Sequence, residues 1–205
     1  MIVTFSGIDG SGKTTRCEAL VRLLRDRGLP AVVSKPAYEA NDAVKDFCEW
    51  AYGDRFAYFD RLDSDFYISC LTADWLRYLA RALSNSKSQI LICDRYIYDV
   101  VAQAIHMRAR ATTLRRLQGF FPKPDISFFL EIAREDAFER LRKRAEPKLH
   151  IAESLSELHV LHEAYEELRR GSDWDLVSVP EATQTEHLAV EVEEAWHRMQ
   201  ITVST

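Results

Sequence analysis

The sequence predicts an α/β fold in which a parallel sheet carries helices on both of its faces. Three observations lead to this prediction: short β-prone runs alternate with segments of helical period, two of these runs are strongly apolar, and a glycine-rich turn follows the first run. A strand that is apolar on both sides is typical of a parallel sheet covered by helices. Strands that alternate with helices build such a sheet through right-handed crossovers.

The first half of the chain alternates strands and helices. Met1–Phe5 is rich in β-branched and aromatic residues and stops at a cluster of glycines. From Lys13–Arg27, apolar residues recur every three or four positions, and a glycine and a proline then end the predicted helix. Ala31–Ser34 is a second short strand. Helices are expected at Asn41–Tyr52 and Leu62–Leu83, joined by an aromatic and acidic connection.

The second half repeats this alternation. Gln89–Cys93 is apolar and ends before an aspartate, Ile126–Ile132 follows a proline-rich turn, and Asp175–Val179 is the last predicted strand. The remaining helices are expected at Val100–Arg110, Thr112–Gln118, Arg134–Arg144, Ser154–Arg170 and Thr183–Met199. Because no repeat, low-complexity tract or linker interrupts this order, residues 1–205 are expected to form a single domain.

Composition excludes several classes of protein. The chain has 205 residues, 47% of them hydrophobic and 29% charged, which suits one domain with a full core rather than a disordered chain. A net charge of −5 gives no basic footprint for nucleic acid, and no stretch approaches the roughly 18 apolar residues of a membrane helix. A glycine-rich loop at Gly7 leaves no room for a signal peptide. Four widely spaced cysteines without a CxxC pair favour a cytoplasmic protein with reduced thiols.

The strongest motif follows the first strand. It reads Gly7-Ile8-Asp9-Gly10-Ser11-Gly12-Lys13-Thr14 and fits G-x4-G-K-[ST] without a mismatch. Its glycines let backbone N–H groups approach phosphate oxygens, and the start of the next helix adds a partial positive charge. Lys13 is expected to reach the β- and γ-phosphates, and the Thr14 hydroxyl to ligate Mg²⁺. The motif therefore predicts a nucleoside-triphosphate site.

A second element, Asp94-Arg95-Tyr96, ends the third predicted strand. An aspartate at the carboxyl end of a buried parallel strand lies at the ligand-binding edge of the sheet, beside the phosphate loop. There Asp94 is expected to hold Mg²⁺ through water, while Arg95 offers a bidentate contact to a phosphate. The alternative is a strand-terminating aspartate followed by a surface arginine.

A third element is the basic cluster Arg140-Leu141-Arg142-Lys143-Arg144, after which Pro147 breaks the helix. We expect residues 142–153 or so to form a short lid, with arginines that close over the triphosphate and neutralise the charge of the transferring phosphoryl group. The alternative is a solvated helix end, because cations near a helix C-terminus are favoured in any case.

These three elements, in this order, resemble the thymidylate kinase family of P-loop nucleoside monophosphate kinases over nearly the whole chain. Phe5–Thr15 looks like the family's opening loop and Asp94-Arg95-Tyr96 like its D-R-[YH] element. The stretch Pro124–Ile132 resembles its P-D-x-x-x-x-L-D/E-V strand, and Glu135–Arg144 resembles the helix and basic lid of its bacterial members. The resemblance implies a five-stranded parallel sheet, ATP with Mg²⁺ as the donor, and a nucleoside monophosphate, with dTMP as the first candidate, as the acceptor.

The resemblance also assigns roles to single residues. It implies that Asp9 lies near the acceptor sugar and phosphate, and that Arg95 lies between the donor and acceptor phosphates. The expected catalytic residues are Lys13, Asp94, Arg95 and Arg144, and the expected metal ligands are Thr14 and Asp94. The expected ATP-binding residues are Gly7, Asp9, Gly10, Ser11, Gly12, Lys13, Thr14, Thr15, Arg140 and Arg142. A homodimer that packs through helices beside the sheet is also implied.

The sequence departs from the family mainly on the acceptor side. The family's arginine after the second strand is absent from Ser34-Lys35-Pro36-Ala37-Tyr38, and its F-x-A-x-R helix reads Leu71-Thr72-Ala73-Asp74-Trp75 here. Asp99 and Gln103 stand where the family has a serine and part of an A-Y-Q element. Lys35 or Arg77 are the candidates for a replacement phosphate cation. The many aromatic residues between Phe47 and Tyr67 would stack on a base or simply fill the core, and the aspartates among them disfavour a dianionic phosphate.

Three functions therefore stay open at the level of sequence. The first is a dTMP kinase with rearranged acceptor contacts, and the second is a kinase for another nucleotide, a nucleoside or a small hydroxylated metabolite. The third is a nucleotide-binding protein without turnover. Retention of Arg95 and the basic cluster favours the two enzymes. The pair His159 and His162 is read as a solvated helix face rather than a zinc site, since no further ligands are placed beside it.

Overall fold

The computed structural model describes residues 1–85, 89–110, 112–113, 119, 121–144, 154–170 and 175–203. Its strands are β1 (Ile2–Ser6), β2 (Ala31–Ser34), β3 (Ile90–Asp94), β4 (Ile126–Leu130) and β5 (Leu176–Val179). Its helices are α1 (Lys13–Asp26), α2 (Glu39–Tyr52), α3 (Tyr58–Arg61), α4 (Ser64–Asn85), α5 (Ile97–His106), α7 (Arg134–Arg142), α8 (Leu155–Arg170) and α9 (Thr185–Val203). The predicted alternation of strands and helices is confirmed.

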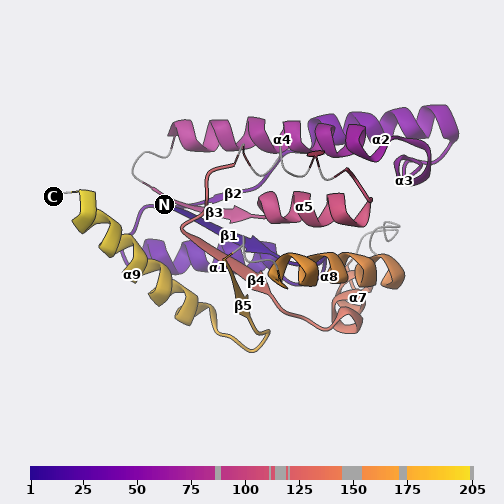
Figure 1. The fold of residues 1–205 in the computed structure, drawn as a ribbon. Coiled ribbons are helices and arrows are strands. Elements are labelled where there is room, and N and C mark those ends of the chain that lie inside the picture. The colour runs from indigo at the N-terminus through magenta and orange to yellow at the C-terminus, as the bar shows by residue number, and fades with distance from the viewer. Residues whose placement is uncertain are drawn as a thin grey trace.

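All five strands are parallel and lie in the order β2-β3-β1-β4-β5. The sheet forms the middle layer in Figure 1, with α1 and α9 on one face and α2, α4, α5 and α8 on the other. Alternate side chains of β1 divide between the two faces: Val3 and Phe5 pack with α1 and α9, whereas Ile2 belongs to the opposite core. The five-stranded parallel sheet with helices on both faces is thus the predicted fold.

The register of the sheet positions the functional elements. Phe5 on β1 lies opposite Asp94 on β3, so the end of β3 reaches the loop that begins at Gly7. β1 also pairs with β4, with Ser6 opposite Phe129, which brings the segment leading into α7 to the same edge. Because carboxyl ends of parallel strands meet at one edge, motifs far apart in the sequence gather there.

Some element boundaries differ from those predicted. The short helix α3 lies in what looked like a connection, and α5 begins at Ile97 instead of Val100. The earlier start of α5 has a local cause, because the Asp99 side chain accepts a hydrogen bond from the backbone N–H of Tyr96 at 2.9 Å and so closes the first turn. Most of the helix predicted at residues 112–118 and most of the predicted lid, residues 145–153, lie outside the described residues.

No helix in the described part of the chain has both the length and the apolar character needed to cross a bilayer.

Candidate functional site

The phosphate loop connects β1 to α1, and its glycines are required by its shape. Gly7, Gly10 and Gly12 have φ angles of +145°, +86° and +87°, in a region that other residues rarely adopt. A Cβ atom on Gly10 would lie 2.5 Å from the carbonyl oxygen of Ala137, at the start of α7. The loop therefore packs backbone against backbone on α7, and a side chain at Gly10 would push the two apart.

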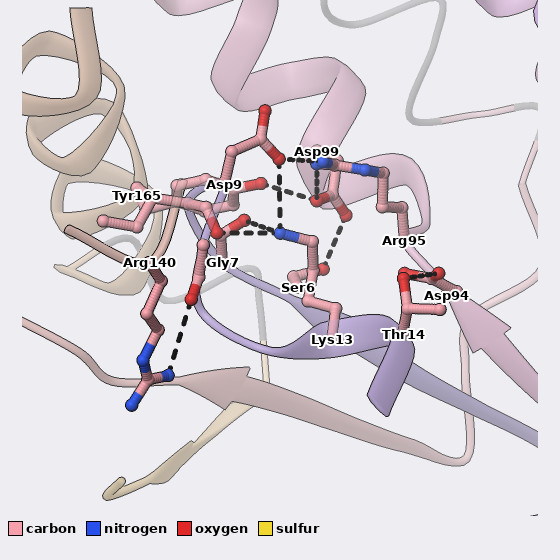
Figure 2. A network of polar contacts seen from close by, with 12 residues as sticks. Ser6, Gly7, Asp9, Lys13, Thr14, Asp94, Arg95, Asp99, Arg140 and Tyr165 are labelled. Carbon is pink, nitrogen blue, oxygen red and sulfur yellow. Dashed lines mark hydrogen bonds and ion pairs between the residues drawn. The ribbon is translucent and has the colours of Figure 1, made fainter. Parts of the chain in front are cut away.

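Lys13 is buried at the centre of this loop (Figure 2). Its Nζ donates hydrogen bonds to the carbonyl oxygens of Gly7 at 2.7 Å and Ile8 at 2.8 Å, and lies 3.7 Å from the Asp9 carboxylate. Burial, and then the nearby charge of Arg95, lower the pKa of Lys13 to about 8. The ammonium is held by neutral carbonyl oxygens and one carboxylate, partners that a more strongly charged phosphate can replace.

Thr14 and Asp94 meet where α1 begins and β3 ends. The Thr14 hydroxyl donates to Asp94 Oδ2 at 2.6 Å, and Asp94 is 2% exposed. Lys35 Nζ, after β2, lies 3.7 Å from the same carboxylate oxygen. A hydroxyl and a carboxylate side by side are the oxygen ligands that Mg²⁺ prefers when phosphate and water complete its coordination. The donor set is therefore compatible with the predicted Mg²⁺.

Arg95 lies between two carboxylates (Figure 2). One guanidinium nitrogen contacts Asp9 of the phosphate loop, and the other donates to Asp99 Oδ1 at 3.3 Å. Its backbone has a φ of +79°, which is uncommon for a residue with a side chain and fixes the direction in which the guanidinium leaves the end of β3. Burial raises the pKa of Asp9, but the charges of Arg95 and Lys13 outweigh it and hold the pKa well below the usual range.

Asp99 is the centre of the network around Arg95, a role that the sequence did not reveal. Besides Arg95 and the Tyr96 backbone, its carboxylate accepts hydrogen bonds from Ser6 Oγ at 2.8 Å and Tyr165 Oη at 2.6 Å. These donors come from β1, from the end of β3 and from α8, so one carboxylate links three elements. Burial and then Asp99 raise the pKa of Tyr165 well above its ordinary value, which keeps the donated proton on the tyrosine.

The basic cluster separates into residues at the site and a residue away from it. Arg140 contacts Glu181 and donates to the Gly10 carbonyl oxygen at 3.5 Å. Arg144 is close enough to Asp9 for its charge to lower the pKa of that carboxyl. Arg142 instead donates to Glu139 at 3.0 Å and lies over the Phe138 ring at 6.0 Å. The structure does not bring Arg142 together with the other predicted ATP-binding residues, because its side chain lies against its own helix and lines neither of the cavities beside the phosphate loop.

Two cavities adjoin the phosphate loop. The first has a volume of about 390 Å³ and is lined by Gly10, Ser11, Gly12, Thr15, Arg16, Leu130, Glu131, Arg140, Arg144, Val179 and Glu181. The second has a volume of about 490 Å³ and extends from the loop, past Asp94 and Arg95, to a wall formed by α2, α3 and α4. Four residues line both cavities: Gly10, Gly12, Thr15 and Arg144.

The second cavity holds residues from the segments that depart from the family pattern. Tyr38, Leu71 and Trp75 all line it, as do Lys35 and Gln103. Sequence reasoning missed five lining residues, Asn41, Lys45, Val100, Leu161 and Tyr165. The first two could have been found together, because a spacing of four places them on one face of α2.

Other candidates from the same region do not reach the cavity. Arg77 forms a bidentate pair with Glu39 on the surface, so the proposal that it replaces a phosphate cation loses its support. The aspartates of the region are also engaged elsewhere: Asp65 pairs with Arg110, and Asp74 accepts hydrogen bonds from the start of α2. The expected acidic repulsion of a phosphate therefore has no basis in these two carboxylates.

The aromatic residues divide between cavity wall and surface. Tyr58, Tyr67 and Trp75 are buried and line the second cavity. A second group is exposed, with Trp50 at 83% exposure. On α2, the Phe47 ring lies near those of Trp50 and Tyr52, and Phe66 is exposed near the start of α4. The buried rings are compatible with either reading, a core or a stacking surface, whereas the exposed rings match neither.

Comparison with known proteins points to the family that the sequence motifs resemble. The family model described as thymidylate kinase matches residues 65–192. A probable thymidylate kinase of Sulfurisphaera tokodaii is 25% identical over 82% of both chains. The thymidylate kinase of Leptospira borgpetersenii is 29% identical over 80% of this chain and 79% of its own, and a probable thymidylate kinase of Sulfolobus acidocaldarius is 28% identical over 82% of both. The family model begins after the phosphate loop, so the loop and the matched region point independently to one family.

Proposed function

This chain belongs to the thymidylate kinase family, and we propose that it transfers the γ-phosphoryl group of ATP to a nucleoside monophosphate, with dTMP as the first candidate. It is a nucleoside monophosphate kinase that takes ATP as its phosphate donor. The observation that carries the proposal is the pair of cavities that meet at Gly10, Gly12, Thr15 and Arg144. A transfer between two bound molecules requires space for both, and both cavities adjoin the phosphate loop.

The chemistry needs no covalent step on the protein. An oxygen of the acceptor phosphate attacks the γ-phosphorus in line, and ADP leaves with the electrons of the broken P–O bond. The loop amides and Lys13 hold the donor phosphates, while Arg95 lies where it can bridge donor and acceptor phosphates. Arg144, which lines both cavities, neutralises charge on the group in transfer.

Mg²⁺ is the metal that we infer for this site. Thr14 is the direct ligand and Asp94 holds its water shell, an assignment supported by the 2.6 Å hydrogen bond between the two side chains. When bound, the ion would neutralise charge on the donor phosphates. Lys35, 3.7 Å from Asp94, balances the carboxylate on the side of the acceptor cavity.

A kinase with another acceptor is the second candidate function. It is favoured by the acceptor cavity, because among the described residues its only lining arginines are Arg95 and Arg144, and Arg144 also lines the first cavity. Lys35 and Lys45 are the other cations beyond the loop lysine. The alternatives are another nucleotide, a nucleoside or a small hydroxylated metabolite. A nucleotide-binding protein without turnover would not need an arginine held beside the phosphate loop by two carboxylates, as Arg95 is.

ADP release from ATP and Mg²⁺ separates these functions. The acceptors to compare are dTMP, dUMP, UMP, CMP, AMP, GMP and the matching nucleosides, each at saturating ATP. Selective stimulation by dTMP is the expected result. Stimulation by a nucleoside or by another monophosphate alone would replace the acceptor, and ATP binding without stimulation by any of them would contradict the proposal of a nucleotide kinase.

We also propose that the protein is a homodimer and that it lies in the cytoplasm. Residues 142–153 are proposed to form a lid. The exposed rings of Phe47, Trp50 and Tyr52, which lie together on α2, support a protein contact there, because such rings are costly to leave in water. The four cysteines are free thiols, which supports a reducing compartment. Sedimentation of the wild type and of Trp50→Ser tests the dimer: loss of the dimer in the variant is expected, and a monomeric wild type would refute it.

A further inference from the structure

At the start of α2, the wall of the acceptor cavity carries a buried hydrogen-bond donor without an acceptor among the described residues. Asn41 is 2% exposed and lines the cavity, and its Nδ2 atom is buried with no hydrogen-bond partner among the described residues. The Tyr67 hydroxyl lies beside this amide but not in a geometry that satisfies the nitrogen. Buried donors are nearly always paired in folded proteins, so an unpaired one that faces a cavity indicates a ligand that supplies the acceptor.

The position of this donor is fixed by the fold. The Asp74 carboxylate on α4 accepts hydrogen bonds from the backbone N–H groups of Ala40 at 2.8 Å and Asn41 at 2.9 Å. This contact satisfies the first turn of α2 and ties it to α4. The Asn41 side chain therefore projects from an anchored backbone, as a recognition group must if it is to select one ligand over another.

Aromatic and apolar side chains from α3 and α4 form the neighbouring part of this wall. Tyr67, Leu71 and Trp75 recur at intervals of four on α4 and line the cavity together. The Tyr58 ring stacks on that of Tyr67, with centroids 4.3 Å apart and planes within 3°. Rings packed in this way leave little freedom, and they offer a surface on which a planar heterocycle can lie.

We propose that Asn41 recognises the acceptor's base, by donating from Nδ2 to an exocyclic carbonyl oxygen of a heterocycle packed on this wall. The inference rests on the proposed function, since it names the part of the acceptor that this wall binds. A pyrimidine with a carbonyl at that edge satisfies the buried donor. A ring with an amino group there would oppose one N–H with another and leave both unpaired.

Replacing the amide by a carboxylate should reverse this choice. The Asn41→Asp side chain only accepts hydrogen bonds, so it would suit an exocyclic amino group in place of a carbonyl oxygen. Lys45, one turn further along α2, lines the same cavity but already pairs with Asp42 at 3.1 Å, so the new carboxylate would rely on the ligand's amino group as its partner. Asn41→Leu has a similar volume and no donor, which tests the loss of the hydrogen bond without a cavity.

The experiment measures kcat and KM for dTMP, dUMP and dCMP at saturating ATP, together with the Kd of ATP. Asn41→Leu is expected to raise the KM of dTMP and dUMP about tenfold, with kcat and ATP affinity little changed. Asn41→Asp is expected to favour dCMP over dTMP relative to the wild type. Ala43→Asp, an exposed position on the same helix, controls for the added charge and should keep the wild-type preference.

The outcomes separate the two claims. A KM for dTMP that stays within about twofold in folded Asn41→Leu, in a wild type that is active with dTMP, would overturn the role of Asn41 and leave the proposed function standing. A wild type inactive with all three nucleotides would overturn both. If Asn41→Asp fails to fold, as thermal denaturation will show, the result with Asn41→Leu decides.

Discussion

The second cavity has two ends that are built on different principles: a donor chamber beside the phosphate loop and an acceptor chamber walled by α2, α3 and α4. On the donor side, polar groups satisfy one another: Lys13 binds loop carbonyls, Thr14 binds Asp94, and Arg95 lies between two carboxylates. On the acceptor side, a wall of stacked and apolar side chains leaves one buried amide nitrogen unpaired. The paired groups on the donor side are held in place before any phosphate binds. The unpaired amide nitrogen on the acceptor side instead needs a ligand that supplies a hydrogen-bond acceptor.

This difference reflects what each chamber must recognise. Every triphosphate presents the same charged oxygens, so a fixed set of cations and amides serves all of them. An acceptor is recognised by the edge of its ring, and discrimination of that kind comes from placing single polar groups on an apolar surface. Mutations on the donor side should therefore reduce turnover with every acceptor, and mutations on the acceptor side should change which acceptor is used.

Lys13→Ala should have the largest effect. Removing the only lysine of the loop takes away the cation that faces the transferring group, and kcat should fall by about 10²–10³ with every acceptor. The fold should survive, because the carbonyl oxygens of Gly7 and Ile8 that Lys13 now satisfies can turn to water. The measurement is ADP release at saturating substrates, with circular dichroism to check the fold.

Turnover of folded Lys13→Ala at the wild-type rate would remove the donor role from the loop. An effect confined to one acceptor would break the contrast between the two chambers, since a loss on the donor side cannot depend on the acceptor's base. The exposed α2 substitution Ala43→Asp serves here as well, as a variant that changes charge outside both chambers.

Asp94→Asn should come next, through the metal. It keeps the size of the side chain and can still accept the hydrogen bond from Thr14, but it removes the charge that attracts Mg²⁺. The Mg²⁺ concentration for half-maximal activity is expected to rise about ten- to a hundredfold. An unchanged Mg²⁺ dependence in the folded variant would remove Asp94 from the metal site.

The basic cluster offers a smaller and internally matched test. Arg144 lines both cavities, whereas Arg142 on the same segment pairs with Glu139 and lines neither. Arg144→Ala should lower kcat about tenfold and change the acceptor KM less, and Arg142→Ala should stay close to wild type. Equal losses in the two variants would mean that the cluster acts through its overall charge instead of through one placed arginine.

Sequence reasoning was most accurate where function depends on contiguous residues. Gly7–Thr14 and Asp94-Arg95 are local motifs at a strand end, and the register of Phe5 with Asp94 brings them together as parallel-sheet geometry requires. The fold followed for the same reason, because apolar strands and helical period leave few ways to build a covered parallel sheet.

The residues of the acceptor chamber could not be predicted from contiguous motifs. Asn41, Tyr67 and Tyr165 come from three helices, and their meeting depends on how those helices pack rather than on spacing in the chain. Asp99 looked like a departure from the family's serine, and only its four donors reveal a structural centre. Arg77 and Arg142 are the opposite case. Their charge and position in the sequence suggested a place in the site, but both side chains pair with glutamates on the surface instead.

The pH dependence of ATP affinity gives the finest test of the donor chamber. Burial lowers the pKa of Lys13 to about 8, so the free enzyme loses this cation as pH rises through that value, whereas bound phosphate keeps it charged. Between pH 7 and 8.5 the Kd of ATP should rise about fourfold, and Lys13→Arg, which stays charged, should show no such rise. Folding stability should change in the opposite direction: the unfolded lysine binds its proton up to about pH 10.5, so the cost of burying it is full below pH 8 and is relieved above. A Kd that rises equally in Lys13→Arg would assign the titration to another group. ATP binding in the donor chamber would then not depend on the protonation of Lys13.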